Sequence, residues 1–256
     1  MGARSSRPRR GAPSRGRHFL GPRSAAELVR AFEVGPADLV VEVGAGTGRL
    51  TRELARSAWL VLAIEIDPAL SSKLLRSARS WPNVFVHQGD ALDTQIPGTS
   101  FRVVGNIPFD ITTALLRRVT RLEQAERLDL ITQLETARKR AATKGSVLSV
   151  LWSTEWRFGL RRRIPARSFH PAPSVDAAWL VAERRPQPLI APIERTSFER
   201  LVRRGFEKAG APIDRSLGLR RSVIRAADLD PDDRAIDLTV GDWIALFRAG
   251  SGDREH

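Results

Sequence analysis

Short apolar runs alternate with amphipathic stretches along the first two thirds of the chain. The runs at 39–43 and 59–65 are nearly continuous in Val, Leu and Ile, as is typical of strands buried on both faces. The pattern predicts strands at 39–43, 59–65, 84–87, 101–104, 128–132, 147–157 and 175–183. It predicts helices at 23–34, 49–57, 68–79, 111–119 and from the fifth strand to about residue 143.

Strands that alternate with helices predict an α/β fold with a mostly parallel, seven-stranded sheet covered on both faces. The last two strands would be joined by an arginine-rich connection. After a proline-bearing segment near residue 186 the pattern becomes helical, at 195–208, 213–225, 232–237 and 241–248. We therefore expect a flexible basic arm at 1–17, a sheet domain at 18–185, and a small helical domain with a tail at 186–256.

The composition excludes several classes of protein. With 256 residues, 42% of them hydrophobic, the chain can bury a core. It has no cysteine, which excludes disulfides and thiolate metal sites, and no His, Asp and Glu cluster has metal-ligand spacing. No apolar run reaches the roughly 18–20 residues that span a membrane, and the N-terminus lacks the apolar core of a secretory signal. We expect a cytoplasmic, soluble protein without a metal.

The charge balance indicates a nucleic-acid partner. Forty-two basic residues face 29 acidic ones, which gives a net charge of +13 and a pI near 11.4. Nearly all the basic residues are arginine, whose planar guanidinium binds phosphate and stacks on bases. A GC-rich genome would also favour arginine over lysine. The basic arm at 1–17 is either an RNA contact or a solvated tail.

A glycine-rich loop follows the first predicted strand. Its sequence, Gly44-Ala45-Gly46-Thr47-Gly48, lies between a strand and a helix, where glycines let the backbone approach a ligand closely. The spacing differs from the dinucleotide fingerprint, and no Gly-Lys-Ser/Thr follows to form a phosphate cradle. Glu65 ends the next strand, where a carboxylate can accept from ribose hydroxyls. Asp90, after the third strand, can accept from an adenine amino group.

A second motif, Asn106-Ile107-Pro108-Phe109, also follows a strand. The amino group of adenine is a poor nucleophile because its lone pair is delocalised into the ring. Hydrogen-bond acceptors placed on its two N–H groups localise the lone pair and stabilise the positive charge that grows during methyl transfer. The Asn106 amide oxygen and the Ile107 carbonyl can act as these acceptors. Pro108 stiffens the turn, and Phe109 can stack on the base. The two motifs together indicate S-adenosylmethionine and an adenine of nucleic acid that leaves its stack.

At this point the chain resembles a known family, the ribosomal RNA adenine N6-methyltransferases, and is most similar to the Erm macrolide-resistance branch. The resemblance covers about residues 15–250. It is carried by Arg17-His18-Phe19-Leu20, Val41 to Gly48, Glu65, Asp90, Asn106 to Phe109, and Arg167-Ser168-Phe169-His170-Pro171-Ala172-Pro173-Ser174-Val175. It implies a Rossmann-like class I methyltransferase fold that uses S-adenosylmethionine.

The resemblance also implies roles for single residues. The cofactor would be bound by His18, Leu20, Gly44, Gly46, Glu65, Asp90 and Asn106. Phe169 would close the face of the target base opposite Phe109. The implied reaction is methylation of N6 on one adenine in the peptidyl-transferase loop of 23S rRNA, before full ribosome assembly and by a monomer. The implied phenotype is resistance to macrolides, lincosamides and streptogramin B.

The chain departs from the family pattern in two motifs, and several alternatives stay open. Arg17-His18 stands where Gln-Asn is usual, and Phe109 stands in place of a tyrosine, which favours the Erm branch. RNA contacts are expected from Arg138-Lys139-Arg140 and Arg161-Arg162-Arg163, or these are solvated faces. The alternatives are a housekeeping small-subunit dimethyladenosine transferase and a non-catalytic RNA- or DNA-binding relative. The number of methyl groups and the host also stay open.

Overall fold

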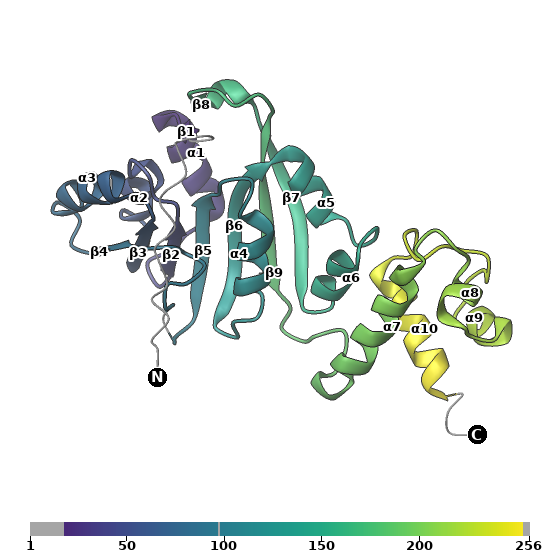
Figure 1. Ribbon diagram of the computed structural model, residues 1–256. Helices are drawn as coiled ribbons and strands as arrows, with labels where there is room; N and C mark the ends of the chain where they lie inside the picture. Colours follow the sequence, from purple (N-terminus) through teal and green to yellow (C-terminus); the bar gives the residue numbers. More distant parts are fainter. Residues whose placement is uncertain (1–17, 97, 253–256) are drawn as a thin grey trace, which may run out of the picture.

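The computed structural model describes residues 18–96 and 98–252, and the basic arm expected at 1–17 lies outside the described residues. A seven-stranded sheet forms the centre of the molecule, in the order β4-β3-β2-β5-β6-β9-β7 (Figure 1). The strands are β2 (Leu39–Val43), β3 (Leu60–Glu65), β4 (Val84–Gln88), β5 (Phe101–Asn106), β6 (Ala125–Gln133), β7 (Trp156–Ile164) and β9 (Ala177–Arg184). The strand β9 alone runs opposite to the other six, so the expected α/β fold with a mostly parallel sheet is confirmed.

Helices cover both faces of this sheet. One apolar core joins the sheet to α1 (Pro22–Phe32), α2 (Arg49–Leu54) and α3 (Pro68–Ala78). The core on the other face contains side chains of α4 (Thr112–Val119) and α5 (Leu134–Ala141). Both cores are made of the apolar runs that the sequence shows, because successive side chains of each strand point to opposite faces.

The carboxyl ends of the parallel strands meet at one edge of the sheet, and a two-stranded pair lies at this edge. The pair consists of β1 (Phe19–Leu20) and β8 (Phe169–His170), with Leu20 opposite Phe169. It joins two segments that are far apart in the chain, and Figure 1 shows it close to α1. The sequence pattern did not predict these short strands.

One predicted strand was wrong. The segment 147–157 begins as a helix, α6 (Val147–Ser153), because the Ser146 hydroxyl accepts the Ser149 amide at 3.1 Å and caps it. The strand starts later, at Trp156, and includes the arginine-rich stretch that was expected to be a connection. This strand, β7, is the edge of the sheet and has a register shift between Leu160 and Arg162. Charged side chains and bulges are common on edge strands because both discourage pairing with other chains.

The C-terminal residues form a helical unit with its own apolar core. Its helices are α7 (Arg195–Glu207), α8 (Ile213–Leu217), α9 (Arg221–Ala226) and α10 (Val240–Gly252). The segment expected as one helix at 213–225 is divided at Gly218, whose φ of 62° ends α8. The helix expected at 232–237 is wrong, because that segment forms turns. Val150 of α6, which precedes this unit in the chain, also belongs to this core. Residue 186 remains our proposed domain boundary.

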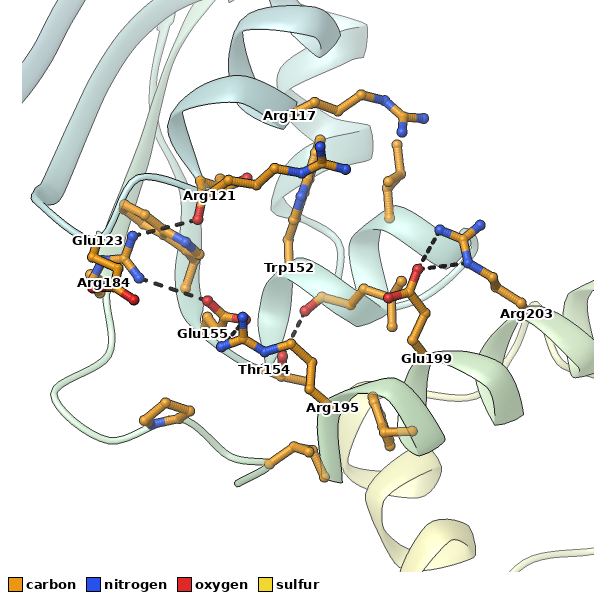
Figure 2. A pocket seen from close by; sticks show the side chains of 17 residues that line it. Arg117, Arg121, Glu123, Trp152, Thr154, Glu155, Arg184, Arg195, Glu199 and Arg203 are labelled. Carbon is orange, nitrogen blue, oxygen red and sulfur yellow. Dashed lines mark hydrogen bonds and ion pairs between the residues drawn. The ribbon is translucent and has the colours of Figure 1, made fainter. Parts of the chain in front are cut away.

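A cavity of about 320 Å³ separates the two units at the amino-terminal edge of the sheet (Figure 2). Glu155 bridges it, with Arg184 at the end of β9 at 3.7 Å and Arg195 of α7 at 2.9 Å. Glu199 pairs with Arg203 within α7 at 2.6 Å. Because the carboxyl ends of the parallel strands lie at the opposite edge, this cavity is remote from both sequence motifs. Its ion pairs connect the helical unit to the sheet.

Among residues 18–96 and 98–252 no helix is both long and apolar enough to cross a membrane.

A buried ionic network connects three central strands, and it generates the first prediction. The Asp129 carboxylate is fully buried and accepts from Arg102 and Arg127, each at 3.0 Å, and from the Trp179 indole at 3.1 Å. Replacing Asp129 with Ala leaves two guanidinium groups without their shared partner. We expect the free energy of unfolding to fall by about 3–5 kcal/mol, measured by urea denaturation.

The control is Asp237→Ala, which breaks an exposed pair with Arg234 (2.8 Å) and should cost about 1 kcal/mol or less. Equal losses for the two variants would contradict a structural role for the network.

Candidate active site

The glycine loop and the tetrapeptide lie against each other. Their strands β2 and β5 are parallel neighbours, so both motifs leave the sheet at its carboxyl edge. A Cβ built on Gly44 would lie 3.7 Å from the backbone oxygen of Asn106 and 3.9 Å from Cδ of Pro108. The structure thus brings the two separately recognised motifs into one site.

The residue before Asn106 must be small for this contact to exist. A Cβ added to Gly105 would lie 2.5 Å from the carbonyl oxygen of Val43, which is backbone and cannot move aside. Glycine at this position lets the end of β5 approach the end of β2 closely. In the sequence, the glycine itself is the only sign that β5 and β2 approach each other closely at this position.

The loop itself forms a narrow cradle. Gly44, Gly46 and Gly48 have φ values of 70°, 56° and 78°, which side-chain-bearing residues rarely adopt. The Gly46 amide donates to the Glu65 carboxylate at 2.7 Å. On its other side, a Cβ on Gly46 would lie 2.9 Å from the ring of Phe19. Backbone, acid and aromatic ring therefore meet with no space for a loop side chain.

The two acids expected to bind a nucleoside lie at the same edge, after adjacent strands. Glu65 is 6% exposed, and its second oxygen accepts the Asp67 amide at 2.8 Å. Asp90 accepts the Leu92 amide at 2.8 Å. A carboxylate has about four lone-pair sites, so each acid keeps acceptor capacity beyond these bonds. The cradle and the two acids fit a cofactor with a ribose diol and an aminopurine.

Residues 18–21, here called the strap, cross the site and are fixed at several points. The Asn106 side-chain amide donates to the His18 carbonyl at 2.6 Å. The His18 ring bonds through Nδ1 to the carbonyl of Pro171 at 2.8 Å, and the Gly21 amide donates to Ser168 at 2.8 Å. The guanidinium of Arg49 donates to the strap carbonyl of Leu20. The sequence had suggested His18 and Leu20 only through the family resemblance, and Arg49 and Phe19 had no assigned role.

The bond to the strap orients Asn106. Because a carbonyl oxygen can only accept, the Nδ2 group of Asn106 must face His18, and Oδ1 must point away from it. The next peptide is held as well, since the buried Ile107 donates its amide to the Ile131 carbonyl at 2.9 Å. Pro108 is exposed and Phe109 is half-buried at the start of the turn into α4. The half-buried Asn106 is thus arranged to present an acceptor.

Phe169 lies in a different environment from Phe109. It is 2% exposed and belongs to the same apolar core as Leu20, its partner in the two-stranded pair. Its ring is therefore not accessible to a base in this structure.

The basic clusters expected to bind RNA differ in exposure. Arg138 and Lys139 are exposed on α5, whereas Arg140 is 8% exposed and lies over the Trp152 ring at 5.4 Å. Burial and the nearby charge of Arg117 lower the pKa of Arg140. The three consecutive arginines of the second cluster, on β7, are exposed and each lies near one acid, in the pairs Arg161–Glu183 at 3.8 Å, Arg162–Glu27 at 3.2 Å and Arg163–Asp176.

Glu42, the last acid before the loop, lies in the motif from Val41 to Gly48 but was given no role of its own from the sequence. It is 1% exposed, and its Oε2 has no hydrogen-bond partner among the described residues. Burial raises the pKa of Glu42 to about 8; Thr51 lowers the pKa in part, and the charge of Glu65 raises it. The position of Glu42 at the end of a buried strand was the available signal.

The first prediction from the site concerns Gly105→Ala. The added methyl group would meet the Val43 carbonyl, so we expect the free energy of unfolding to fall by about 1–3 kcal/mol. Gly210→Ala is the matched control, because a Cβ there meets nothing within 4 Å. Urea denaturation of both variants checks this, and an unchanged stability for Gly105→Ala would contradict the close approach of the strands.

The second prediction from the site concerns how the free energy of unfolding depends on pH. The Glu42 carboxyl stays protonated in the folded protein up to about pH 8, but ionises near pH 4.5 when unfolded. Between these values the folded state binds one more proton, so unfolding free energy should fall by about 1.4 kcal/mol per pH unit as pH rises. Glu42→Gln removes this contribution, and the variant should therefore gain stability relative to the unmodified chain as pH rises. Parallel stability curves for the two proteins would refute a neutral Glu42.

Comparisons with known proteins agree with this site. The family described as ribosomal RNA adenine dimethylase matches residues 11–249. An rRNA methyltransferase of Streptomyces thermotolerans is 40% identical over 243 residues, 91% of this chain and 81% of the relative. The mycinamicin-resistance protein MyrB of Micromonospora griseorubida is 35% identical, over 91% of this chain and 77% of its own.

A small-subunit relative and a solved structure complete the comparison. Ribosomal RNA small subunit methyltransferase A of Moorella thermoacetica is 34% identical, over 92% of this chain and 91% of its own. The crystal structure of the 23S rRNA methyltransferase ErmE matches with a TM-score of 0.83 and 31% identity, over 90% of this chain and 98% of that one. The chain therefore belongs to the ribosomal RNA adenine dimethylase family and is a methyltransferase that uses S-adenosylmethionine.

Proposed function

We propose that the protein transfers a methyl group to N6 of a single adenine in the peptidyl-transferase loop of 23S rRNA, and that this gives resistance to macrolide, lincosamide and streptogramin B antibiotics. The observation that carries the proposal is the oriented Asn106, whose Oδ1 points away from the strap. The likeness to a 23S rRNA methyltransferase and to a mycinamicin-resistance protein supports this choice of substrate.

The cofactor would be held along the carboxyl edge. The glycine loop would lie against the methionine part, Glu65 would accept from the ribose hydroxyls, and Asp90 would accept from the adenine amino group. His18 and Leu20 would border the cofactor through the strap. The bound cofactor supplies an electrophilic methyl group on a positively charged sulfur. The residues around it have to bring the acceptor nitrogen into line and exclude water.

The chain's own chemistry acts on the target amine. Asn106 Oδ1 and the Ile107 carbonyl accept the two N–H groups of the adenine. Because these acceptors are fixed before the base arrives, they stabilise the positive charge that develops on the nitrogen without rearranging. Phe109 stacks on one face of the base. Phe169 would close the other face, and for this its buried ring has to become accessible when the RNA binds.

RNA affinity would come from phosphate contacts outside this site. Arg138, Lys139 and the arginines of β7 are exposed and available for this role, and Arg140 contributes only if it leaves its buried position. Such contacts supply affinity without choosing the sequence. We propose that the substrate is 23S rRNA before full assembly, bound by a monomer in the cytoplasm, where ribosomal RNA is made.

A second candidate is dimethylation of small-subunit rRNA, favoured by the 34% identity to a small-subunit methyltransferase. The two functions differ in the RNA that is modified. Parallel assays with a 23S transcript and a small-subunit transcript distinguish them.

The prediction is that Asn106→Ala lowers kcat for methyl transfer to a 23S transcript by about 100-fold or more, because one of two acceptors is lost. Asn83→Ala is the matched control. It removes the only other asparagine, whose amide donates to Ala55 and Ala58 at 3.0 and 2.9 Å far from the site. That variant should keep its kcat. Urea denaturation and circular dichroism check that Asn106→Ala still folds, and undiminished transfer by it would overturn the proposed mechanism.

A further inference from the structure

A second cavity, of about 270 Å³, lies at the carboxyl edge of the sheet beside the proposed reaction site. It is lined by Gln133, Leu134, Glu135, Val175 and Asp176. None of these residues has a role in the methyl transfer described above.

The strand register fixes how far the cavity is from Asn106. Asn106 pairs with Ile131 on the neighbouring strand, and Gln133 lies two residues further along it. With strands about 4.8 Å apart and a rise of about 3.3 Å per residue, the two Cα atoms are roughly 8 Å apart. The cavity is thus near enough to the site for a nucleotide that adjoins the target base to reach it. The Leu134 amide donates to the Asp176 carbonyl at 3.0 Å, which joins the two segments that line the cavity.

The two carboxylates at the cavity differ in their hydrogen bonds and in their exposure. Asp176 is used by the protein, since it accepts the Ala166 amide at 2.8 Å and pairs with Arg163, and these contacts lower its pKa. Glu135 has a 79% exposed side chain and lies 3.7 Å from Arg138. It is the carboxylate that a ligand can reach.

The remaining lining suits a planar base. Val175 is 39% exposed and, with Leu134, gives the cavity apolar side chains. Among the described residues, the side-chain amide of Gln133 has no hydrogen-bond partner, although Gln133 precedes α5. An amide offers both a donor and an acceptor, whereas a carboxylate accepts only and repels phosphate.

We propose that this cavity holds the nucleobase next to the target adenine, and that Gln133 and Glu135 select a base with an exocyclic amino group. The inference rests on the proposed function, because it assumes that the target strand lies along this edge. A side-chain amide can bind adenine in a bidentate manner, and a carboxylate accepts from amino groups. Uracil has no amino group, and its single N3–H donor lies between two carbonyl oxygens, which a carboxylate repels.

The experiment uses the full chain and a 23S domain V transcript in which either neighbour of the target adenine is replaced by uracil. Methyl-transfer kcat/KM and transcript binding by fluorescence anisotropy are both measured. We expect uracil at one of the two positions to lower both by roughly ten-fold for the unmodified chain. In the double variant Gln133→Ala, Glu135→Ala the loss should disappear. Glu126→Gln, an exposed acid at the other end of β6, is the control and should keep the discrimination.

Two results would overturn the inference: equal use of all transcripts by the unmodified chain, or unchanged discrimination in a folded double variant. The failure of the proposed function is seen separately. If the unmodified chain transfers no methyl group to any transcript, the proposed function fails. Base discrimination in the binding assay, and its loss in the double variant, still decides whether the cavity reads a neighbouring base.

Discussion

The hydrogen bond from the Asn106 amide to the His18 carbonyl is the interaction on which the rest of the site depends. It joins the end of the central strand to the strap and leaves Oδ1 free to accept. The bond requires that the strap be anchored, which Arg49 and the pairing of β1 with β8 provide. It also requires β5 to approach β2, which the missing side chain of Gly105 allows. Local backbone requirements and one polar contact thus set the geometry of a reactive acceptor.

The distribution of charge separates recognition of bases from recognition of phosphates. The chain has a net charge of +13, yet Glu42, Glu65 and Asp90 follow one another along the carboxyl edge. The carboxylates of Glu65 and Asp90 can accept from hydroxyl and amino groups and would repel phosphate, whereas the exposed arginines attract it. Burial keeps Glu42 protonated near neutral pH, which limits the negative charge beneath the glycine loop.

The sequence predicted most of the sheet because continuous apolar runs identify buried strands, and both motifs follow such runs. It failed at 147–157, where apolar residues of similar type form a helix because Ser146 caps it. It could not reveal the strap, whose contacts join residues about 150 positions apart. It also could not show that Arg140 is buried whereas Arg138 is exposed, because helical spacing alone does not identify the neighbours of each face.

The central claim is methylation of a single ribosomal adenine through the acceptor that Asn106 presents. Mass spectrometric mapping of ribosomal RNA from a susceptible bacterium that expresses the protein tests it most directly. The account predicts new N6-methylation at one adenine of the 23S peptidyl-transferase loop, and the spectrum also distinguishes one methyl group from two. Modification confined to small-subunit rRNA, or no new methylation despite abundant folded protein, would contradict it.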